Sequence, residues 1–278
     1  MIEPLKRRRI MRDPKYRRGM YLLPSLFTIG NLFCGYACVV YAMRGDFEFA
    51  AILIGIAFVV DSIDGSIARL TGTSTAFGVQ LDSLADVVSF GLAPAVLAFR
   101  WGLEDLGRKG WAAGFLFLAA AALRLARFNI QSANQLDKRY FVGMPSPAAA
   151  GVIAATVYAW PAALTGPVTQ DGWLYETLHI TTRAFALAVV LVPAALMVST
   201  IRFRSFKTIN FGWVPSYFAP LVFALALVVI VAAHEWVFPV MAYGYVASGF
   251  IGLAITRVKA RRHGPPPPVP PATPATSP

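Results

Sequence analysis

Long apolar runs dominate the chain between residues 20 and 257. Short polar stretches separate these runs, and none of the runs alternates apolar and polar residues as a half-buried strand would. A bilayer crossing needs roughly 20 mostly apolar residues. Because lipid offers no partners for backbone polar groups, such spans favour helices, whose hydrogen bonds are internal. The pattern therefore predicts an all-α, polytopic integral membrane protein.

We expect about eight transmembrane helices. Their predicted ranges are 22–43, 48–69, 80–100, 111–128, 147–164, 184–201, 217–234 and 236–256. Residues 1–19 are predicted to form a basic arm, residues 20–258 the transmembrane domain, and residues 259–278 a tail that is first basic and then rich in proline. Proline lacks a backbone donor and fixes φ, so the tail is predicted to be disordered.

The charge balance is basic, with 25 Lys+Arg against 14 Asp+Glu. Such an excess can indicate nucleic-acid binding, but here the basic residues gather at the ends of alternate apolar segments. This distribution is typical of the cytoplasmic ends of membrane helices. We therefore expect no nucleic-acid partner, contact with membrane lipids, and both termini in the cytoplasm.

Four aspartates stand at or near the ends of two consecutive predicted spans, in the segment DSIDGSIARLTGTSTAFGVQLDSLAD. They are Asp61, Asp64, Asp82 and Asp86. A carboxylate within a span costs about 2.5–3.5 kcal/mol on insertion scales, so four of them require a compensating ion or partner. Their spacing of three and four residues places each pair on one helix face. The intervening TGTSTAFG favours a turn that folds the two helices into an antiparallel hairpin.

Two facing pairs of carboxylates predict a site for Mg²⁺, Mn²⁺ or Ca²⁺, because these ions prefer oxygen ligands and no histidine or cysteine lies nearby. Two such ions would suit an in-line displacement at phosphorus. A divalent-cation transporter would also carry carboxylates within the membrane. The four acids lie toward one side, however, and the other predicted spans contain no second acidic cluster. The pattern favours catalysis over transport.

Small residues and one arginine accompany the acids. Gly65 and Ala68 leave room for a substrate to approach the helix, but small residues also serve close helix packing. Gly78 can relax the turn before the second helix. Arg69 either holds a diphosphate or is only a charge at the end of a span.

These residues together resemble the signature of the CDP-alcohol phosphatidyltransferases. The matching positions are Asp61, Asp64, Gly65, Ala68, Arg69, Gly78, Asp82 and Asp86. The resemblance implies the fold of that family, a homodimer, and two divalent ions (Mg²⁺ or Mn²⁺) held by the four aspartates. It also implies that Gly65, Ala68, Arg69 and Gly78 line a CDP site, and that Asp86 is the base for the incoming hydroxyl.

Other segments resemble the bacterial membrane-embedded phosphatidylserine synthases of that family. They are PSLFTIGNLFCG at 24–35, SFGLAPA at 89–95, LRLARFN at 123–129, GMPSPAAAG at 143–151 and STIRFRSFK at 199–207. The implied reaction transfers the phosphatidyl group of CDP-diacylglycerol to the hydroxyl of L-serine and releases CMP, at the cytoplasmic face of the inner membrane. Glycerol 3-phosphate or an inositol phosphate is the alternative acceptor.

A serine acceptor requires a cation for its carboxylate. The residues predicted to contact serine or a lipid phosphate are Arg124, Arg127, Asn129, Ser146, Arg202 and Arg204. Each arginine could instead mark the cytoplasmic side.

Overall fold

The computed structural model describes residues 14–71, 75–133, 140–161, 173–204 and 232–263; toward the ends of some elements it describes the backbone alone. These residues are helical apart from two short strands and the connections. The long helices are α2 (Pro14–Arg44), α3 (Phe47–Thr71), α6 (Arg108–Ala133), α8 (Trp173–Val198) and α10 (His234–His263). The shorter elements are α4 (Ala76–Val87), η1 (Val88–Leu92), α5 (Ala93–Ala98), η2 (Phe99–Leu103), η3 (Glu104–Leu106) and α7 (Ser146–Ala159).

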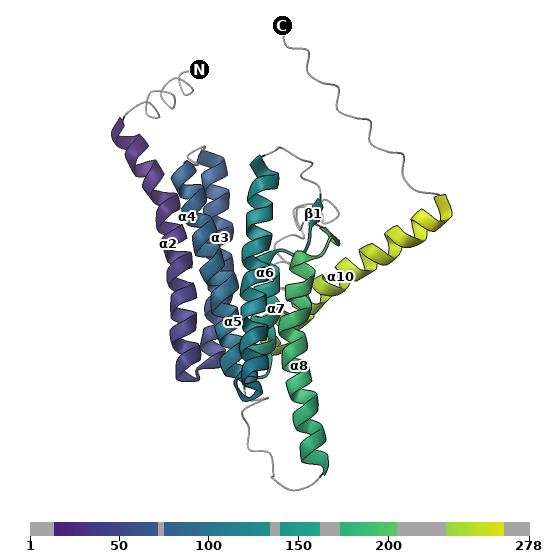
Figure 1. The fold of residues 1–278 in the computed structure, drawn as a ribbon. Coiled ribbons are helices and arrows are strands. Elements are labelled where there is room, and N and C mark those ends of the chain that lie inside the picture. The colour runs from purple at the N-terminus through teal and green to yellow at the C-terminus, as the bar shows by residue number, and fades with distance from the viewer. Residues whose placement is uncertain (1–13, 72–74, 134–139, 162–172, 205–231, 264–278) are drawn as a thin grey trace.

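The bundle consists of α2, α3, the continuous segment from α4 to η3, α6, α7 and α8, and each of these runs antiparallel to the one before it (Figure 1). Within the described residues, five helical segments are long and apolar enough to cross a membrane. They are Leu26–Arg44, Phe77–Leu106, Arg108–Ile130, Thr181–Val198 and Glu235–Leu253. The all-α membrane fold is thus confirmed, whereas the count of eight spans stays a prediction. The predicted span 217–234 lies almost wholly outside the described residues.

Local signals in the sequence explain where the helices near the site begin. Asp46 follows the left-handed Gly45 (φ 82°) and accepts a hydrogen bond from the backbone of Phe49, at the start of α3. Thr75 caps α4 by accepting from the backbone of Gly78 at 2.9 Å. Such caps satisfy backbone donors that the first helical turn leaves free. These caps fix where α3 and α4 begin.

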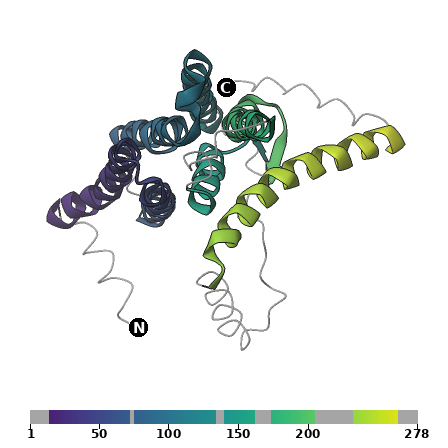
Figure 2. The same cartoon turned by 90° about the horizontal axis from the view of Figure 1, so that it is seen from below.

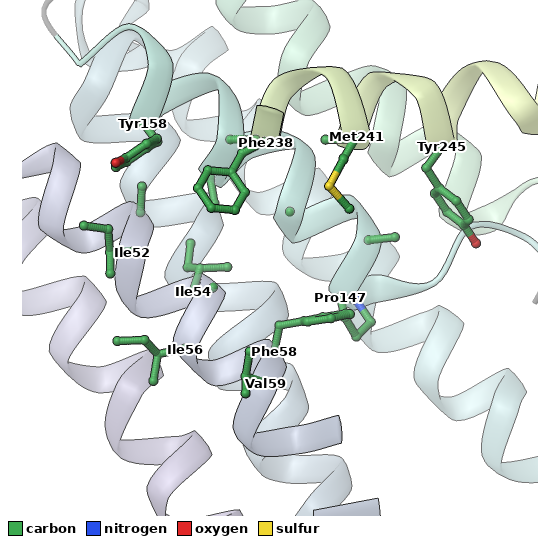
Figure 3. A pocket seen from close by; sticks show the side chains of 17 residues that line it. Ile52, Ile54, Ile56, Phe58, Val59, Pro147, Tyr158, Phe238, Met241 and Tyr245 are labelled. Carbon is green, nitrogen blue, oxygen red and sulfur yellow. The ribbon is translucent and has the colours of Figure 1, made fainter. Parts of the chain in front are cut away.

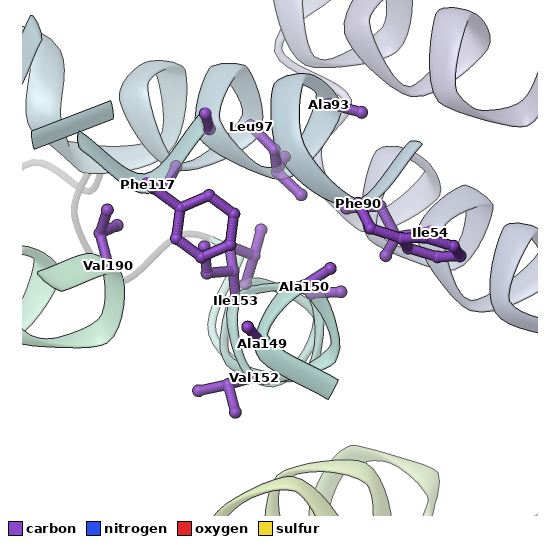
Figure 4. Packing of buried hydrophobic residues seen from close by; sticks show 14 of the residues in the cluster. Ile54, Phe90, Ala93, Leu97, Phe117, Ala149, Ala150, Val152, Ile153 and Val190 are labelled. Atoms are coloured by element: carbon purple, nitrogen blue, oxygen red, sulfur yellow. The ribbon is translucent and has the colours of Figure 1, made fainter. Parts of the chain in front are cut away.

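Helix α7 occupies the centre of the bundle. It contacts α3, α5, α6, α8 and α10. Figure 4 shows Ala149, Ala150 and Ile153 of α7 against Phe90 of η1 and Phe117 of α6, all of which are buried. Alanine dominates the buried positions of α7. Small side chains let neighbouring helices approach closely, which is how helices associate in membranes.

The segment after α4 is wider than an α-helix. The π-helical η1 begins at Val88, two residues after Asp86. Here the Ser89 hydroxyl donates to the main-chain oxygen of Asn31 in α2 at 2.8 Å. Gly35 makes this approach possible, because a Cβ at that position would lie 2.6 Å from Ser89 Oγ and 2.8 Å from its Cα. The close contact locks α2 against the helix that carries two of the aspartates.

Two strands that the sequence did not predict connect the ends of three helices. Strand β1 (Tyr140–Val142) follows α6, and β2 (Arg202–Arg204) follows α8; they pair antiparallel, with Phe141 opposite Phe203. Gly143 has φ 87° and donates to the main-chain oxygen of Ile201 at 2.9 Å. The pairing holds the start of α7 beside the end of α8.

Helix α10 lies obliquely to the bundle. In the view of Figure 2 several bundle helices are seen nearly end-on, whereas α10 runs across the picture. Its first half packs against α7, where Tyr243 and Thr156 share a hydrogen bond of 2.7 Å between their hydroxyls. Residues 14–19 of the predicted arm belong to α2, and residues 259–263 of the predicted tail belong to α10. Residues 1–13 and 264–278 lie outside the described residues.

Replacing Gly35 with alanine is expected to destabilise the protein by about 1–3 kcal/mol, the usual effect of overpacking a core. The added methyl group would meet the backbone of η1, which cannot rotate away as a flexible side chain could. Thermal unfolding of the detergent-purified protein measures the effect. Gly30→Ala is the control, because a Cβ there would find its nearest neighbour at 3.7 Å. Equal melting temperatures for the two variants would contradict this packing.

Candidate metal centre

Three carboxylates from α3 and α4 meet beside α2, which contacts both helices. One oxygen from each of Asp61, Asp82 and Asp86 lies within 4.8 Å of the other two. The hairpin predicted from the sequence therefore forms and brings the two acidic faces together. All three side chains are half-buried. Like charges at this separation repel strongly, because the surrounding apolar helices provide little dielectric screening.

Asp64 lies one helical turn from Asp61 and has a different environment. Its side chain is 5% exposed, and its Oδ2 accepts a hydrogen bond from the Thr28 hydroxyl of α2 at 2.5 Å. Its Oδ1 is buried and has no hydrogen-bond partner among the described residues. A buried carboxylate oxygen without a partner is unfavourable. The fourth aspartate thus keeps one oxygen available for a cation.

This donor set fits a divalent cation. Carboxylate oxygens are the ligands of Mg²⁺, Mn²⁺ and Ca²⁺, and an ion between the three carboxylates would remove their mutual repulsion. The cluster could therefore hold a metal ion, as the sequence predicted. The free oxygen of Asp64 points to the same conclusion from an independent observation.

Among the described residues, Arg124 of α6 is the basic side chain that interacts electrostatically with Asp86. Its Nη1 donates to the Ser146 hydroxyl at 2.9 Å, and its guanidinium lies 5.5 Å from the centre of the Phe128 ring. Arg124 also interacts electrostatically with Tyr245 of α10. The arginine thereby connects the acidic cluster with the start of α7 and with α10.

The other predicted contacts of serine or phosphate are less well placed. Arg127 is exposed, and Asn129 donates from Nδ2 to the Ser83 hydroxyl at 2.9 Å, which joins α6 to α4. Arg202 and Arg204 lie in β2, close to the start of α7 along the sheet, but their side chains are outside the described part of the chain. Of the six candidates, the structure thus brings Arg124 and Ser146 together beside the aspartates.

The residues that the signature assigns to CDP lie around the same hairpin. Gly65 is half-buried in α3 and follows Asp64, and Gly78 lies in the first turn of α4. The backbone of Gly78 is used for the cap by Thr75, so this glycine has a structural role in the helix start. Ala68 and Arg69 belong to α3, and their side chains fall outside the described residues.

Sequence reasoning missed four residues that shape the site: Thr28, Asn31, Ser83 and Tyr245. Asn31 Nδ2 donates to Asp86 Oδ1 at 3.4 Å. A signal was present in the sequence, because Thr28 and Asn31 are polar residues three apart within an apolar span. Buried polar groups in membrane helices are costly and often functional. Tyr245 could not be found in this way, because its relation to Arg124 depends on the oblique course of α10.

An apolar cavity of about 570 Å³ lies between α3, α7 and α10 (Figure 3). Ile52 and Tyr158 lie at one end of it, and Val59 and Pro147 lie toward the other (Figure 3). None of the four aspartates lines the cavity, but its lining includes Tyr245 of α10. Tyr245 interacts with Arg124, which in turn interacts with Asp86. Arg124 therefore connects the cavity lining with the acidic cluster.

The comparison with known families agrees with this arrangement. A family model described as CDP-alcohol phosphatidyltransferase matches residues 21–241, which is most of the chain. The chain belongs to this family. The matched region contains the acidic hairpin, Arg124 and the lining of the cavity up to Met241.

Similar proteins carry a more specific name. The CDP-diacylglycerol–serine O-phosphatidyltransferase of Helicobacter pylori is 37% identical over 193 residues, covering 69% of this chain and 76% of that protein. The protein of the same name from Mycobacterium leprae is 38% identical over 49% of this chain and 47% of its own. The archaetidylserine synthase of Methanothermobacter thermautotrophicus is 35% identical over 52% and 61%.

Replacing Asp82 with asparagine is expected to weaken Mn²⁺ binding by about tenfold or more, because a ligand and a negative charge are lost together. Electron paramagnetic resonance of free Mn²⁺ measures the affinity in detergent without any substrate. Asp46→Asn is the matched control: it removes an exposed carboxylate outside the cluster and keeps a side-chain oxygen for the cap of α3. Similar Mn²⁺ affinities for both variants and the wild type would contradict a metal centre at the hairpin.

Proposed function

We propose that this protein is a phosphatidylserine synthase that transfers the phosphatidyl group of CDP-diacylglycerol to the hydroxyl of L-serine. The observation that carries the proposal is the set of three carboxylates within 4.8 Å of one another, at the family's signature positions and beside an apolar cavity. The names of the similar proteins support serine as the acceptor.

The reaction is a displacement at the phosphorus that carries diacylglycerol. The serine oxygen forms a bond to this phosphorus, the bond from phosphorus to the CMP oxygen breaks, and CMP leaves with the electron pair. Asp86 takes the proton of the serine hydroxyl. Bound divalent cations, which we propose to be two Mg²⁺ or Mn²⁺ ions held by the four aspartates, would offset the charge of the diphosphate. Gly65, Ala68, Arg69 and Gly78 are proposed to line the space for the CDP group.

The apolar cavity provides a place for part of the lipid substrate. Its lining comes from α3, α7 and α10 and consists almost entirely of apolar side chains. We propose that an acyl chain occupies this cavity, whose lining is connected with the acidic cluster through Tyr245 and Arg124. The lipid could then react without leaving the bilayer. This accounts for a hydrophilic reaction centre within a bundle of membrane helices.

Arg124 and Ser146 are the proposed contacts of the serine carboxylate. Arg124 is oriented by its hydrogen bond to Ser146 and faces Asp86, the proposed base. A carboxylate bound to this guanidinium would place the serine hydroxyl near Asp86, which is the geometry an in-line attack needs. Arg202 and Arg204 remain proposed contacts of serine or a lipid phosphate, supported by the course of β2 alone.

The proposal includes the division of the chain into segments and its orientation in the membrane. We propose a basic cytoplasmic arm at 1–19, a catalytic membrane domain at 20–258 and a cytoplasmic tail at 259–278, in a homodimer in the inner membrane. In Figure 1 the start of α2, the end of α3, the start of α4 and the end of α6 lie toward the same end of the bundle as β1. Basic residues of the sequence cluster at these ends, which favours the cytoplasmic side for the site.

The choice of acceptor can be measured directly. Purified protein given CDP-diacylglycerol and Mn²⁺ or Mg²⁺ is expected to release CMP and form phosphatidylserine with L-serine, and to form no product with glycerol 3-phosphate or inositol phosphate. Asp86→Asn is expected to abolish turnover, because the base and a metal ligand are lost together. Thin-layer chromatography of the lipid products makes the measurement. Product with another acceptor would keep the chemistry and overturn the serine assignment, and an active Asp86→Asn enzyme would overturn the role of Asp86.

Two arginines of α6 are expected to differ in their effect on kcat/KM for serine. Arg124→Gln is expected to lower kcat/KM for serine about 10- to 100-fold, because a hydrogen bond to a charged group contributes about 1.5–3 kcal/mol. Arg127→Gln changes the same residue type on the same helix but at an exposed position, so we expect less than about a twofold effect from this surface charge. Initial rates at varied serine measure both. If the two variants lose activity equally, the assignment of Arg124 to serine fails.

A further inference from the structure

We propose that Thr28 and Asn31 of α2 are positioning residues for the metal centre, which orient Asp64 and Asp86. The proposal rests on the metal site of the proposed function. It adds a third helix to a centre that the family signature confines to residues 61–86. Neither residue belongs to that signature.

The first support is a pair of hydrogen bonds from one face of α2. Thr28 donates its hydroxyl to Asp64 Oδ2 at 2.5 Å, and Asn31 donates its amide to Asp86 Oδ1 at 3.4 Å. The two residues are three apart in a helix, so they lie on the same face. One thus reaches an aspartate of α3 and the other an aspartate of α4. A single helix face therefore contacts both sides of the acidic hairpin.

The second support is burial. Thr28 is 4% exposed and Asn31 is 1% exposed, within a helix that is otherwise apolar at this depth. A polar side chain buried among membrane helices is unfavourable unless it is paired. The Asn31 amide nitrogen must face Asp86, because turning the amide would place two oxygens against each other. The orientation of Asn31 is therefore set by the carboxylate itself.

The third support is that α2 is fixed relative to the acids. Ser89 donates its hydroxyl to the main-chain oxygen of Asn31 at 2.8 Å, and Gly35 allows η1 to pack directly against α2. Asn31 thus contacts both Asp86 and η1, which begins two residues after Asp86. Such support from rigid neighbours is what keeps metal ligands in the geometry that the ion requires.

The consequence for Asp64 is specific. The bond from Thr28 occupies Oδ2 and leaves Oδ1 buried, without a partner among the described residues. A free carboxylate would rotate between several orientations, whereas this one is held with a single oxygen available. The arrangement accounts for the place of Asp64 outside the group of three oxygens and leaves Oδ1 as the atom that we propose to bind a cation.

The test measures Mn²⁺ affinity directly by electron paramagnetic resonance, on full-length protein in detergent without substrate. Thr28→Val keeps the shape of the side chain and removes the hydroxyl; Asn31→Leu does the same for the amide. Both are expected to weaken Mn²⁺ binding about 10- to 100-fold, the usual effect of losing a partner of a metal ligand. Thr28→Ser keeps the hydroxyl and is expected to restore nearly the wild-type affinity.

The matched control is Cys38→Ala, which changes a fully buried side chain two turns further along α2, against Ala93. It is expected to leave Mn²⁺ affinity unchanged. Thermal unfolding without metal identifies any variant that does not fold. Because Thr28 acts through Asp64, Thr28→Val added to Asp64→Asn should cause no further loss; this comparison remains valid if Asn31→Leu is unstable.

The turnover of the same variants distinguishes this proposal from the proposed function. At saturating Mn²⁺ we expect Asn31→Leu to lower kcat while KM for CDP-diacylglycerol is unchanged, because the base is displaced and lipid binding is not. Wild-type Mn²⁺ affinity in folded Thr28→Val and Asn31→Leu proteins would overturn the positioning role. Weakened Mn²⁺ binding in a protein that makes no phosphatidylserine would instead uphold it and overturn the proposed reaction.

Discussion

The repulsion between the carboxylates of α3 and α4 is the constraint on which the rest of this structure depends. Three oxygens within 4.8 Å of one another cannot stay ionised inside an apolar bundle unless positive charge or hydrogen-bond donors offset them. The chain provides both kinds of partner from outside the hairpin, as Arg124 from α6 and as Thr28 and Asn31 from α2. Packing then follows this requirement: Gly35 and the π-helical turn at η1 bring α2 close enough to act.

The sequence predicted the parts of the fold and site that depend on local pattern. Apolar runs identified most of the helices, and the spacing of Asp61, Asp64, Asp82 and Asp86 identified a hairpin with two acidic faces, because a regular helix converts spacing into direction. The all-helical class and the family both follow from such periodic or fixed-distance signals.

Features that depend on the path of the chain in space could not be predicted. The strands β1 and β2 are three residues each and pair across a long sequence separation, so no periodicity reveals them. The different environments of Arg124 and Arg127 depend on which way α6 faces, and the place of Tyr245 depends on the oblique course of α10. Asn31 was predictable in part. The sequence shows a polar residue within an apolar span, but only the structure shows that it contacts Asp86.

Helix α7 has a consequence for the shape of the membrane around the protein. Its 14 residues rise about 21 Å, whereas the hydrocarbon core of a bilayer is about 30 Å thick. Because the helix is shorter than the hydrocarbon core, an end of it lies within the hydrocarbon depth. Ser146 and Arg124 are polar groups at its start. If this is the deep end, water and ions reach the site through a depression in the bilayer surface. A lipid that exchanges its headgroup there moves by lateral diffusion alone, and the energetic barrier of lifting two acyl chains into water never arises.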